Sequence, residues 1–244
     1  MKEQFKEAFD LIAKQDIDGV ITGSYMLGYH KDWHQDLDVF VYNEQSFRSL
    51  LYFMHYNPMF LILDKLEKHK FDEYIKHNKS GIDKIGLITI KFYWNTCVPV
   101  NVIFKKFHHT IFDVLSNFDL ELIATGHDIK SGKVLSLRET TGMIGSWNTW
   151  NNSFYQPNYW SVKRLCRQFE RVVKYESRGY DLSSVTNKYI ELVENILEME
   201  NVYTSEKGTA FHENTKAEFQ IVLKILQTYK KEGKISEEAL QILK

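Results

Sequence analysis

The sequence predicts a protein of the α/β (α+β) class, with a mixed sheet and flanking helices followed by a helical domain. Short apolar runs rich in Val, Ile and Phe alternate with amphipathic stretches up to about residue 138. From residue 159 onward the apolar spacing is helical throughout. The segment between these parts has weak periodicity and many turn residues, so we expect two domains, at residues 1–150 and 151–244.

The spacing of apolar residues and the turn signals place each element of the first domain. In chain order we expect a helix over residues 3–15, a strand over 17–22, a short helix over 25–30, a strand over 36–42, a helix over 43–56, a helix over 57–77, strands over 85–94 and 98–106 joined as a hairpin, a short helix over 110–118, and strands over 119–125 and 133–137. Asn43 suits the N-cap of its helix, and Pro58 suits a first helical position.

The second domain is expected to consist of helices alone. Their ranges are 159–179, 183–201, 214–233 and 236–243. Gly179 is expected to end the first of them in the left-handed conformation, and Ser236 is expected to cap the last.

The composition favours a cytoplasmic globular protein. There are 31 basic and 32 acidic residues, so a strongly basic nucleic-acid-binding surface is not indicated. Cys97 and Cys166 are the only cysteines and lie in unlike contexts, which favours a reducing compartment. The N-terminus is amphipathic and contains acids, unlike a signal peptide, and no apolar run reaches the roughly 18 residues of a membrane span, so we expect no membrane partner.

Two acids inside an apolar strand are the strongest functional signal. Asp36 and Asp38 are two residues apart in "DLDVFVY", so both point to the same side of a strand. Neighbouring buried carboxylates repel each other unless a cation compensates them, and Mg²⁺, with Mn²⁺ as an alternative, suits oxygen ligands. Gly23 and Ser24 offer backbone N–H groups that a phosphate can approach closely. The pattern predicts a site for a metal-bound triphosphate.

This combination resembles the nucleotidyltransferase superfamily of the DNA polymerase β type. Its Gly-Ser and Asp-x-Asp signature is matched by Gly23, Ser24, Asp36 and Asp38. The stretches "FDLELIATGHD", "GKV" and "RVVKYESRGYDL" are similar to a poorly characterised branch seen among viral and large multidomain proteins, and the similarity spans about residues 17–182. The resemblance implies a mixed sheet backed by helices and two-metal transfer of a nucleoside monophosphate from a nucleoside triphosphate (NTP), ATP among them.

The acceptor of that transfer is not readable from the sequence. An RNA 3′ end, a protein side chain and a small hydroxylated molecule all stay open as partners.

The third acid of this superfamily usually stands on a later strand beside the first two. By order, that position holds Asn101, whose amide can offer an oxygen but brings no charge. The other candidate is Asp119, which would share a strand face with Glu121. We predict Asp119 as a catalytic metal ligand beside Asp36 and Asp38, although it could also cap a helix or face water.

Asn101 keeps a second interpretation open. If it is the true equivalent of the third acid, the chain keeps the fold without catalysis, as a nucleotide sensor or as a component of a defence or toxin–antitoxin pair.

A row of cations lies on one side of the helix predicted over residues 159–179. Lys163, Arg167, Arg171 and Lys174 follow a spacing that places them on one face. We predict that these four residues, the basic stripe, bind the phosphates of the nucleotide. A solvated face with ion pairs to nearby glutamates is the alternative.

Overall fold

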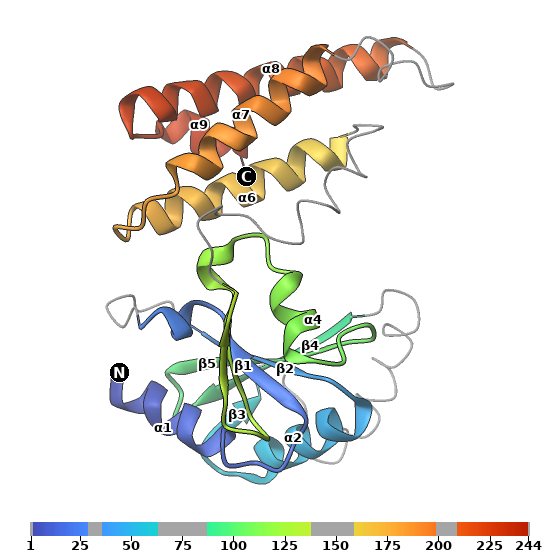
Figure 1. Cartoon of the computed structure of the whole chain (residues 1–244), viewed down its shortest axis with the longest axis vertical. Helices are drawn as coiled ribbons and strands as arrows, with labels where there is room; N and C mark the ends of the chain where they lie inside the picture. Colours follow the sequence, from blue (N-terminus) through green and yellow to red (C-terminus); the bar gives the residue numbers. More distant parts are fainter. Residues whose placement is uncertain (1, 29–35, 63–86, 138–158, 199–208, 244) are drawn as a thin grey trace. The chain divides into compact units, whose positions relative to one another are not determined.

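The structure is a computed structural model of the 244-residue chain, and it describes residues 2–28, 36–62, 87–137, 159–198 and 209–243 (Figure 1). The chain divides into two compact units, residues 1–139 and 140–244. The domain boundary predicted at residue 150 falls in the range 138–158, outside the described residues, and stays a prediction.

The first unit contains a seven-stranded mixed sheet in the order β3-β4-β5-β2-β1-β6-β7. Its strands are β1 (Gly19–Thr22), β2 (Leu37–Val41), β3 (Phe60–Ile62), β4 (Leu87–Trp94), β5 (Val98–Lys105), β6 (Thr125–Asp128) and β7 (Val134–Ser136). Its helices are α1 (Lys2–Ile12), α2 (Glu44–Tyr56), α4 (Ile111–Ser116) and the 3₁₀ helices η1 (Ser24–Leu27) and η3 (Glu121–Ile123).

The second unit is helical in its described residues. Its helices are α6 (Tyr159–Glu176), α7 (Ser183–Glu198), α8 (Thr209–Glu232) and α9 (Glu237–Leu243). The predicted fold class, a mixed sheet with flanking helices followed by a helical second part, is therefore confirmed.

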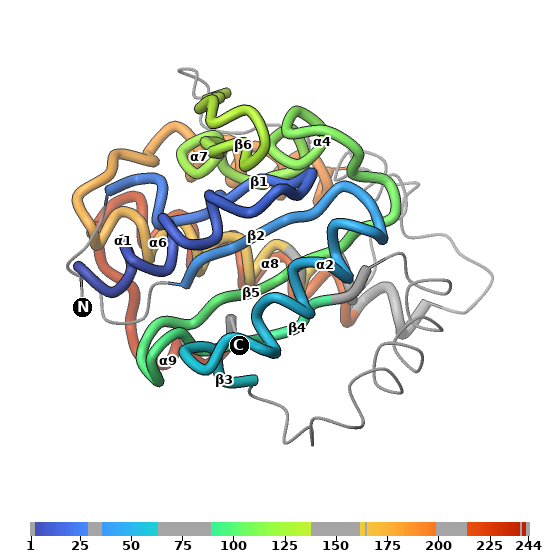
Figure 2. The backbone as a smooth tube through the Cα atoms, turned by 90° about the horizontal axis from the view of Figure 1, so that it is seen from below, coloured from blue at the N-terminus to red at the C-terminus, as the bar shows by residue number. Residues whose placement is uncertain are grey.

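One face of the sheet packs against α1 and α2 (Figure 2). Residues alternate between the two faces of a strand, so every second residue of the central strands is buried on this side. The buried residues are Leu37, Val39 and Val41 of β2 and Val98, Val100 and Val102 of β5, which join Phe5, Ala8 and Ile12 of α1 and Phe47, Leu50, Leu51 and Met54 of α2 in one core. The intervening residues of β2 and β5 are left for the opposite face, which carries the candidate site.

The hairpin expected between β4 and β5 is confirmed, and its turn sets the register of β4 against β5. Asn95 and Thr96 have φ values of 46° and 61°, the left-handed conformation of turns that match the twist of the strands. The resulting register places Lys91 directly opposite Asn101.

The helix ends follow the expected capping residues. The Asn43 side chain accepts the Ser46 N–H at 2.7 Å at the start of α2, and Ser236 accepts a backbone N–H at the start of α9. At the end of α6, Gly179 has a φ of 90° and the Tyr180 N–H donates to the Tyr175 carbonyl, which is the pattern of a Schellman motif.

The helix predicted to begin at Asn57-Pro58 is wrong in its first residues. Asn57 ends α2, its side-chain oxygen accepts the Met59 N–H at 3.0 Å, and its carbonyl accepts the Phe60 N–H at 3.0 Å. The chain therefore turns at Pro58 and enters the edge strand β3, where Phe60 is buried against Trp94. The predicted continuation from residue 63 to 77 lies outside the described residues.

The strand predicted over residues 119–125 is also wrong over most of its length. Burial does not alternate along this segment, because Asp119, Leu120 and Glu121 are all buried. The Ile123 and Ala124 N–H groups donate to carbonyls three residues back, which is the 3₁₀ pattern. The chain accordingly forms η3 and pairs as β6 only from Thr125. The short helix expected from Tyr25 is present as the 3₁₀ helix η1.

Apolar packing and the carboxylate of Glu176 hold the helices of the second unit together. Phe169 of α6, Tyr189 of α7 and Phe219 of α8 are fully buried. Glu176, at the end of α6, accepts hydrogen bonds from the Tyr229 hydroxyl of α8 and from the Leu182 N–H before α7. Within the described ranges, every helix is too short or too polar to cross a lipid bilayer.

The burial of the His108 imidazole makes the stability of the fold depend on pH. Its side chain is 4% exposed and packs against Phe40, and burial lowers its pKa to about 4, with Lys105 and His109 acting in the same direction and Asp113 opposing them. Between pH 6.5 and 4 the unfolded chain binds a proton at this position that the folded chain does not, so stability falls as the pH falls through this window.

When the pH is lowered from 7.5 to 5.0, we expect the free energy of unfolding to fall less in His108→Phe than in the wild type, because the variant lacks the group that binds the proton. Urea denaturation at each pH measures the two values. The exposed neighbour supplies the control, because His109→Phe should keep the wild-type pH dependence. Equal pH dependence in His108→Phe and the wild type would contradict the assignment.

Candidate active site

A row of polar side chains crosses four adjacent strands on the sheet face opposite α1 and α2. Thr22 of β1 pairs with Asp38 of β2, Asp38 pairs with Asn101 of β5, and Asn101 pairs with Lys91 of β4. Directly paired residues point to the same face of a sheet. Asp36 stands two residues before Asp38, so the structure gathers both acids, the amide and a lysine on one face.

The amide of Asn101 joins the two acids. Its Nδ2 donates to Asp36 Oδ2 at 2.7 Å and to Asp38 Oδ1 at 2.9 Å. Ionised carboxylates only accept hydrogen bonds, so the amide must turn its nitrogen toward them. Hydrogen bonds to charged acceptors are stronger than those between neutral groups, and these two offset part of the repulsion between the carboxylates.

The Gly-Ser turn lies against this pair. Gly23 has φ 86° and ψ −161°, a combination that is essentially restricted to glycine. A Cβ atom at this position would stand 2.5 Å from Asp38 Oδ2, so glycine is required by space as well as by conformation. Ser24 is buried at the start of η1, and the Thr22 hydroxyl donates to the Thr125 carbonyl at 2.6 Å, which fixes the end of β1 to β6.

Asp119 and Glu121 lie on the segment between α4 and β6, where both side chains are buried. Because Glu121 opens η3, which packs against η1, the two acids do not share a strand face as predicted. Among the described residues no three His, Cys, Asp or Glu side chains form a group that could hold a metal ion. The structure thus does not bring Asp119 into such a group with Asp36 and Asp38, and its role as a ligand stays a prediction.

The donor set fits a cation that arrives with a phosphate group. Mg²⁺ is commonly held by one or two carboxylates together with substrate phosphates rather than by an all-protein cage. Asp36 and Asp38 supply two such carboxylates, and the Gly23 backbone lies beside one of them. Asn101 occupies the position predicted for a third acid and presents its nitrogen there instead of an oxygen.

The four residues of the basic stripe belong to α6 of the second unit. Arg167 and Lys174 are exposed, whereas Lys163 and Arg171 are half-buried. Burial raises the pKa of Glu218 on α8, and the positive charge of Lys163 opposes that shift. Lys163 therefore lies near Glu218 within its own unit, and contact between the stripe and a nucleotide stays a prediction.

Lys91 is a candidate that the sequence pattern did not single out. It is exposed and stands on the site face next to Asn101. Counting back from the hairpin turn at Asn95 and Thr96 would have found it, because the turn sets which residues are paired.

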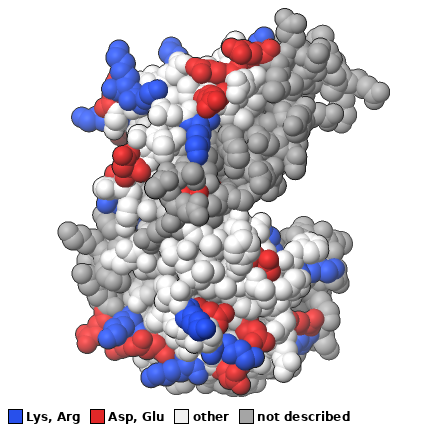
Figure 3. Space-filling view, viewed as in Figure 1, with Lys and Arg blue, Asp and Glu red and all other residues white. Residues whose placement is uncertain are grey.

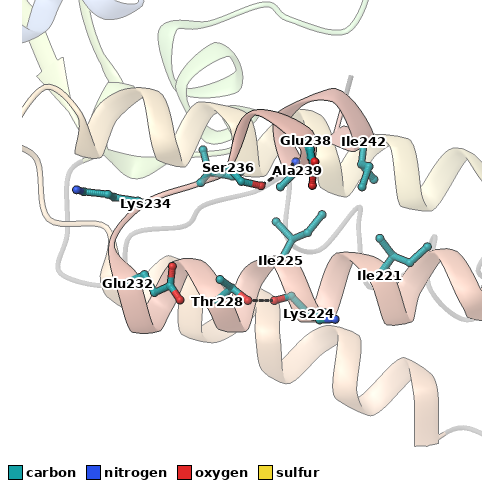
Figure 4. A pocket seen from close by; sticks show the side chains of 11 residues that line it. Ile221, Lys224, Ile225, Thr228, Glu232, Lys234, Ser236, Glu238, Ala239 and Ile242 are labelled. Carbon is teal, nitrogen blue, oxygen red and sulfur yellow. Dashed lines mark hydrogen bonds between the residues drawn. The ribbon is translucent and has the colours of Figure 1, made fainter.

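Acidic and basic residues are interspersed over the first unit on the face shown in Figure 3, as the near-zero net charge leads one to expect. A cavity of about 660 Å³ lies in the second unit between α8 and α9 (Figure 4). Ile221, Ile225 and Ile242 contribute apolar lining, and the charged residues Lys224, Lys234, Glu232 and Glu238 line it as well. It is not part of the acid site, and we assign no chemistry to it.

Comparisons with known proteins place few constraints on the chain. No protein-family model matches it, and no curated protein matches its sequence. A solved structure of the CCA-adding enzyme of Thermotoga maritima, in complex with tRNA, is similar with a TM-score of 0.46 and 14% sequence identity over 91% of this chain. The chain spans about half of that enzyme, 52% of its length. At this level of similarity, no statement about activity or partners follows.

Gly23→Ala tests how tightly the turn is held against the acid pair. We expect a loss of about 2 kcal/mol or more in the free energy of unfolding, because the new Cβ meets Asp38 and the conformation disfavours any side chain. Gly28→Ala is the control: Gly28 also has a positive φ, 69°, but a Cβ there has no atom within 4 Å, so we expect only about 1 kcal/mol. Urea denaturation measures both, and equal losses would show that Asp38 does not restrict the turn.

Proposed function

We propose that the first unit binds an NTP as its Mg²⁺ or Mn²⁺ complex and transfers the nucleoside monophosphate to an acceptor. The observation that supports the proposal most directly is the placement of Asp36 and Asp38 on one sheet face, against the glycine turn at Gly23. Such a pair is costly to bring together, and a cation with a bound triphosphate would compensate it.

Each residue has a distinct role in this proposal. Asp36 and Asp38 hold the cation, which neutralises phosphate charge and polarises the phosphate oxygens when bound. The backbone N–H groups at Gly23 and Ser24 face the β- and γ-phosphates. Asp119 completes the ligand set.

In the transfer, the acceptor hydroxyl gives its proton to water as its oxygen bonds to the α-phosphorus. The bond from the α-phosphorus to the α–β bridging oxygen breaks, and its electron pair leaves with pyrophosphate. The acceptor is an RNA 3′ end, a protein side chain or a small hydroxylated molecule.

Binding without transfer is the second candidate function. Asn101 favours it, because an amide in the place of the third acid supplies neither charge nor a base. The chain would then be a nucleotide sensor or a component of a defence or toxin–antitoxin pair.

Isothermal calorimetry with each of the four NTPs, with and without Mg²⁺, tests nucleotide binding. We expect Mg²⁺-dependent binding of at least one NTP, and its loss in Asp38→Asn, because one of the two carboxylates for the cation is removed. Asp16→Asn is the matched control, since Asp16 is exposed and outside the site, and it should bind like the wild type. The proposal fails if no NTP binds in a metal-dependent way.

Pyrophosphate release in the presence of RNA, protein and small-molecule acceptors separates transfer from binding. If Asp119 completes the site, Asp119→Asn should lower that release by orders of magnitude while circular dichroism stays unchanged. Metal-dependent binding without any release would instead support the second candidate.

Reversal of charge on the basic stripe tests its part in nucleotide binding. In Arg167→Glu with Lys174→Glu we expect NTP affinity to fall by about tenfold at low salt and by less at high salt, since exposed charges are screened. Lys224→Glu with Lys230→Glu makes the same charge change at exposed positions of α8 and should leave affinity unchanged. Equal affinity in both double variants would mean that the stripe is a solvated face, and a lower melting temperature in the stripe variant would mean a structural role.

A further inference from the structure

The two carboxylates present different oxygens to different neighbours. Asn101 Nδ2 donates hydrogen bonds to Asp36 Oδ2 at 2.7 Å and to Asp38 Oδ1 at 2.9 Å. The other oxygen of Asp38, Oδ2, is the one beside Gly23. The site therefore has an amide side, toward β5, and a glycine side, where Asp38 Oδ2 stands beside the turn that begins η1.

The amide side is unsuited to a cation. A metal ion there would meet an N–H donor in place of an oxygen ligand, and binding would break two charge-assisted hydrogen bonds. Lys91 adds a positive charge on the same sheet face, directly across from Asn101. Both features disfavour a second cation on this side.

We propose that Asn101 limits the site to a single divalent cation, taken on the glycine side together with the phosphates of a nucleotide. The inference rests on the proposed nucleotide site and adds its metal stoichiometry. An acceptor then approaches beside an amide and a lysine, and no second metal ion activates its hydroxyl group. Asn101 is in this sense a specificity-determining residue, because it places an N–H donor where a carboxylate would hold a second cation.

Replacement of Asn101 by aspartate should change the stoichiometry. Asn101→Asp removes the N–H donor and places a third carboxylate beside the first two at nearly the same volume. Three adjacent carboxylates repel one another, so this variant should be less stable than the wild type without metal and should gain more in melting temperature from Mn²⁺.

Equilibrium dialysis measures the number of Mn²⁺ ions and nucleotides bound per chain and does not depend on catalysis. The probe is Mn²⁺ with an equimolar mixture of the four NTP analogues that carry a methylene group between the α- and β-phosphorus. The excess of manganese and of nucleotide on the protein side gives the bound amount per chain, with Asp38→Asn as the background for weak surface sites.

We expect about one Mn²⁺ and one nucleotide per chain in the wild type, and about two Mn²⁺ and one nucleotide in Asn101→Asp. Asn187→Asp, the same substitution at an exposed position of α7, is the matched control and should bind as the wild type does. Two Mn²⁺ in the wild type, or one in Asn101→Asp, would overturn the inference. If the wild type binds neither manganese nor nucleotide, the proposed function fails as well, so the two failures are distinguishable.

Asn101→Ala and Asn101→Glu keep the test decisive if the aspartate variant does not fold. Asn101→Ala removes the donor without adding a carboxylate, so it should still bind about one Mn²⁺ per chain; Asn101→Glu, which does add a carboxylate, should bind about two. A count that stays at one in Asn101→Glu would also overturn the inference.

Discussion

The hydrogen bonds from the Asn101 amide to Asp36 and Asp38 are the interaction on which the candidate site depends. Two carboxylates on one strand face repel each other, and their partial burial strengthens that repulsion because less water screens them. The amide is a neutral donor that satisfies both at once. It can do so only because β2 and β5 are parallel neighbours in register, with Asp38 opposite Asn101.

That register is in turn a consequence of the core. The alternate residues of β2 and β5 are fully buried against α1 and α2, and a shift of one residue would move the site residues into the core and the valines to the surface. The packing of the apolar face thus fixes which residues lie side by side on the polar face. The turn at Asn95 and Thr96 adds a second restraint, because it fixes β4 on β5 and brings Lys91 beside the amide.

The polar row on the sheet face is mixed in charge. It combines the carboxylates of Asp36 and Asp38 with the neutral amide of Asn101 and the positive charge of Lys91. The turn at Gly23 brings the backbone close to Asp38, which a side chain at this position would prevent. Nucleotide binding is the property that both proposed functions share.

The sequence by itself determined the class of fold, most elements and the central motif. Regular apolar spacing, cap residues such as Asn43 and Ser236, and the Asp36/Asp38 alternation are local signals, and each one predicts its own structure. Tertiary structure decided which segments meet. Phe60 joins a strand because Trp94 and its neighbours offer a partner. The residues around Glu121 form a 3₁₀ turn, in which the Ala124 N–H donates to the Glu121 carbonyl, and their side chains are buried on consecutive positions. The contact of Asn101 with both acids joins residues more than 60 positions apart, and only the pairing of strands determines such contacts.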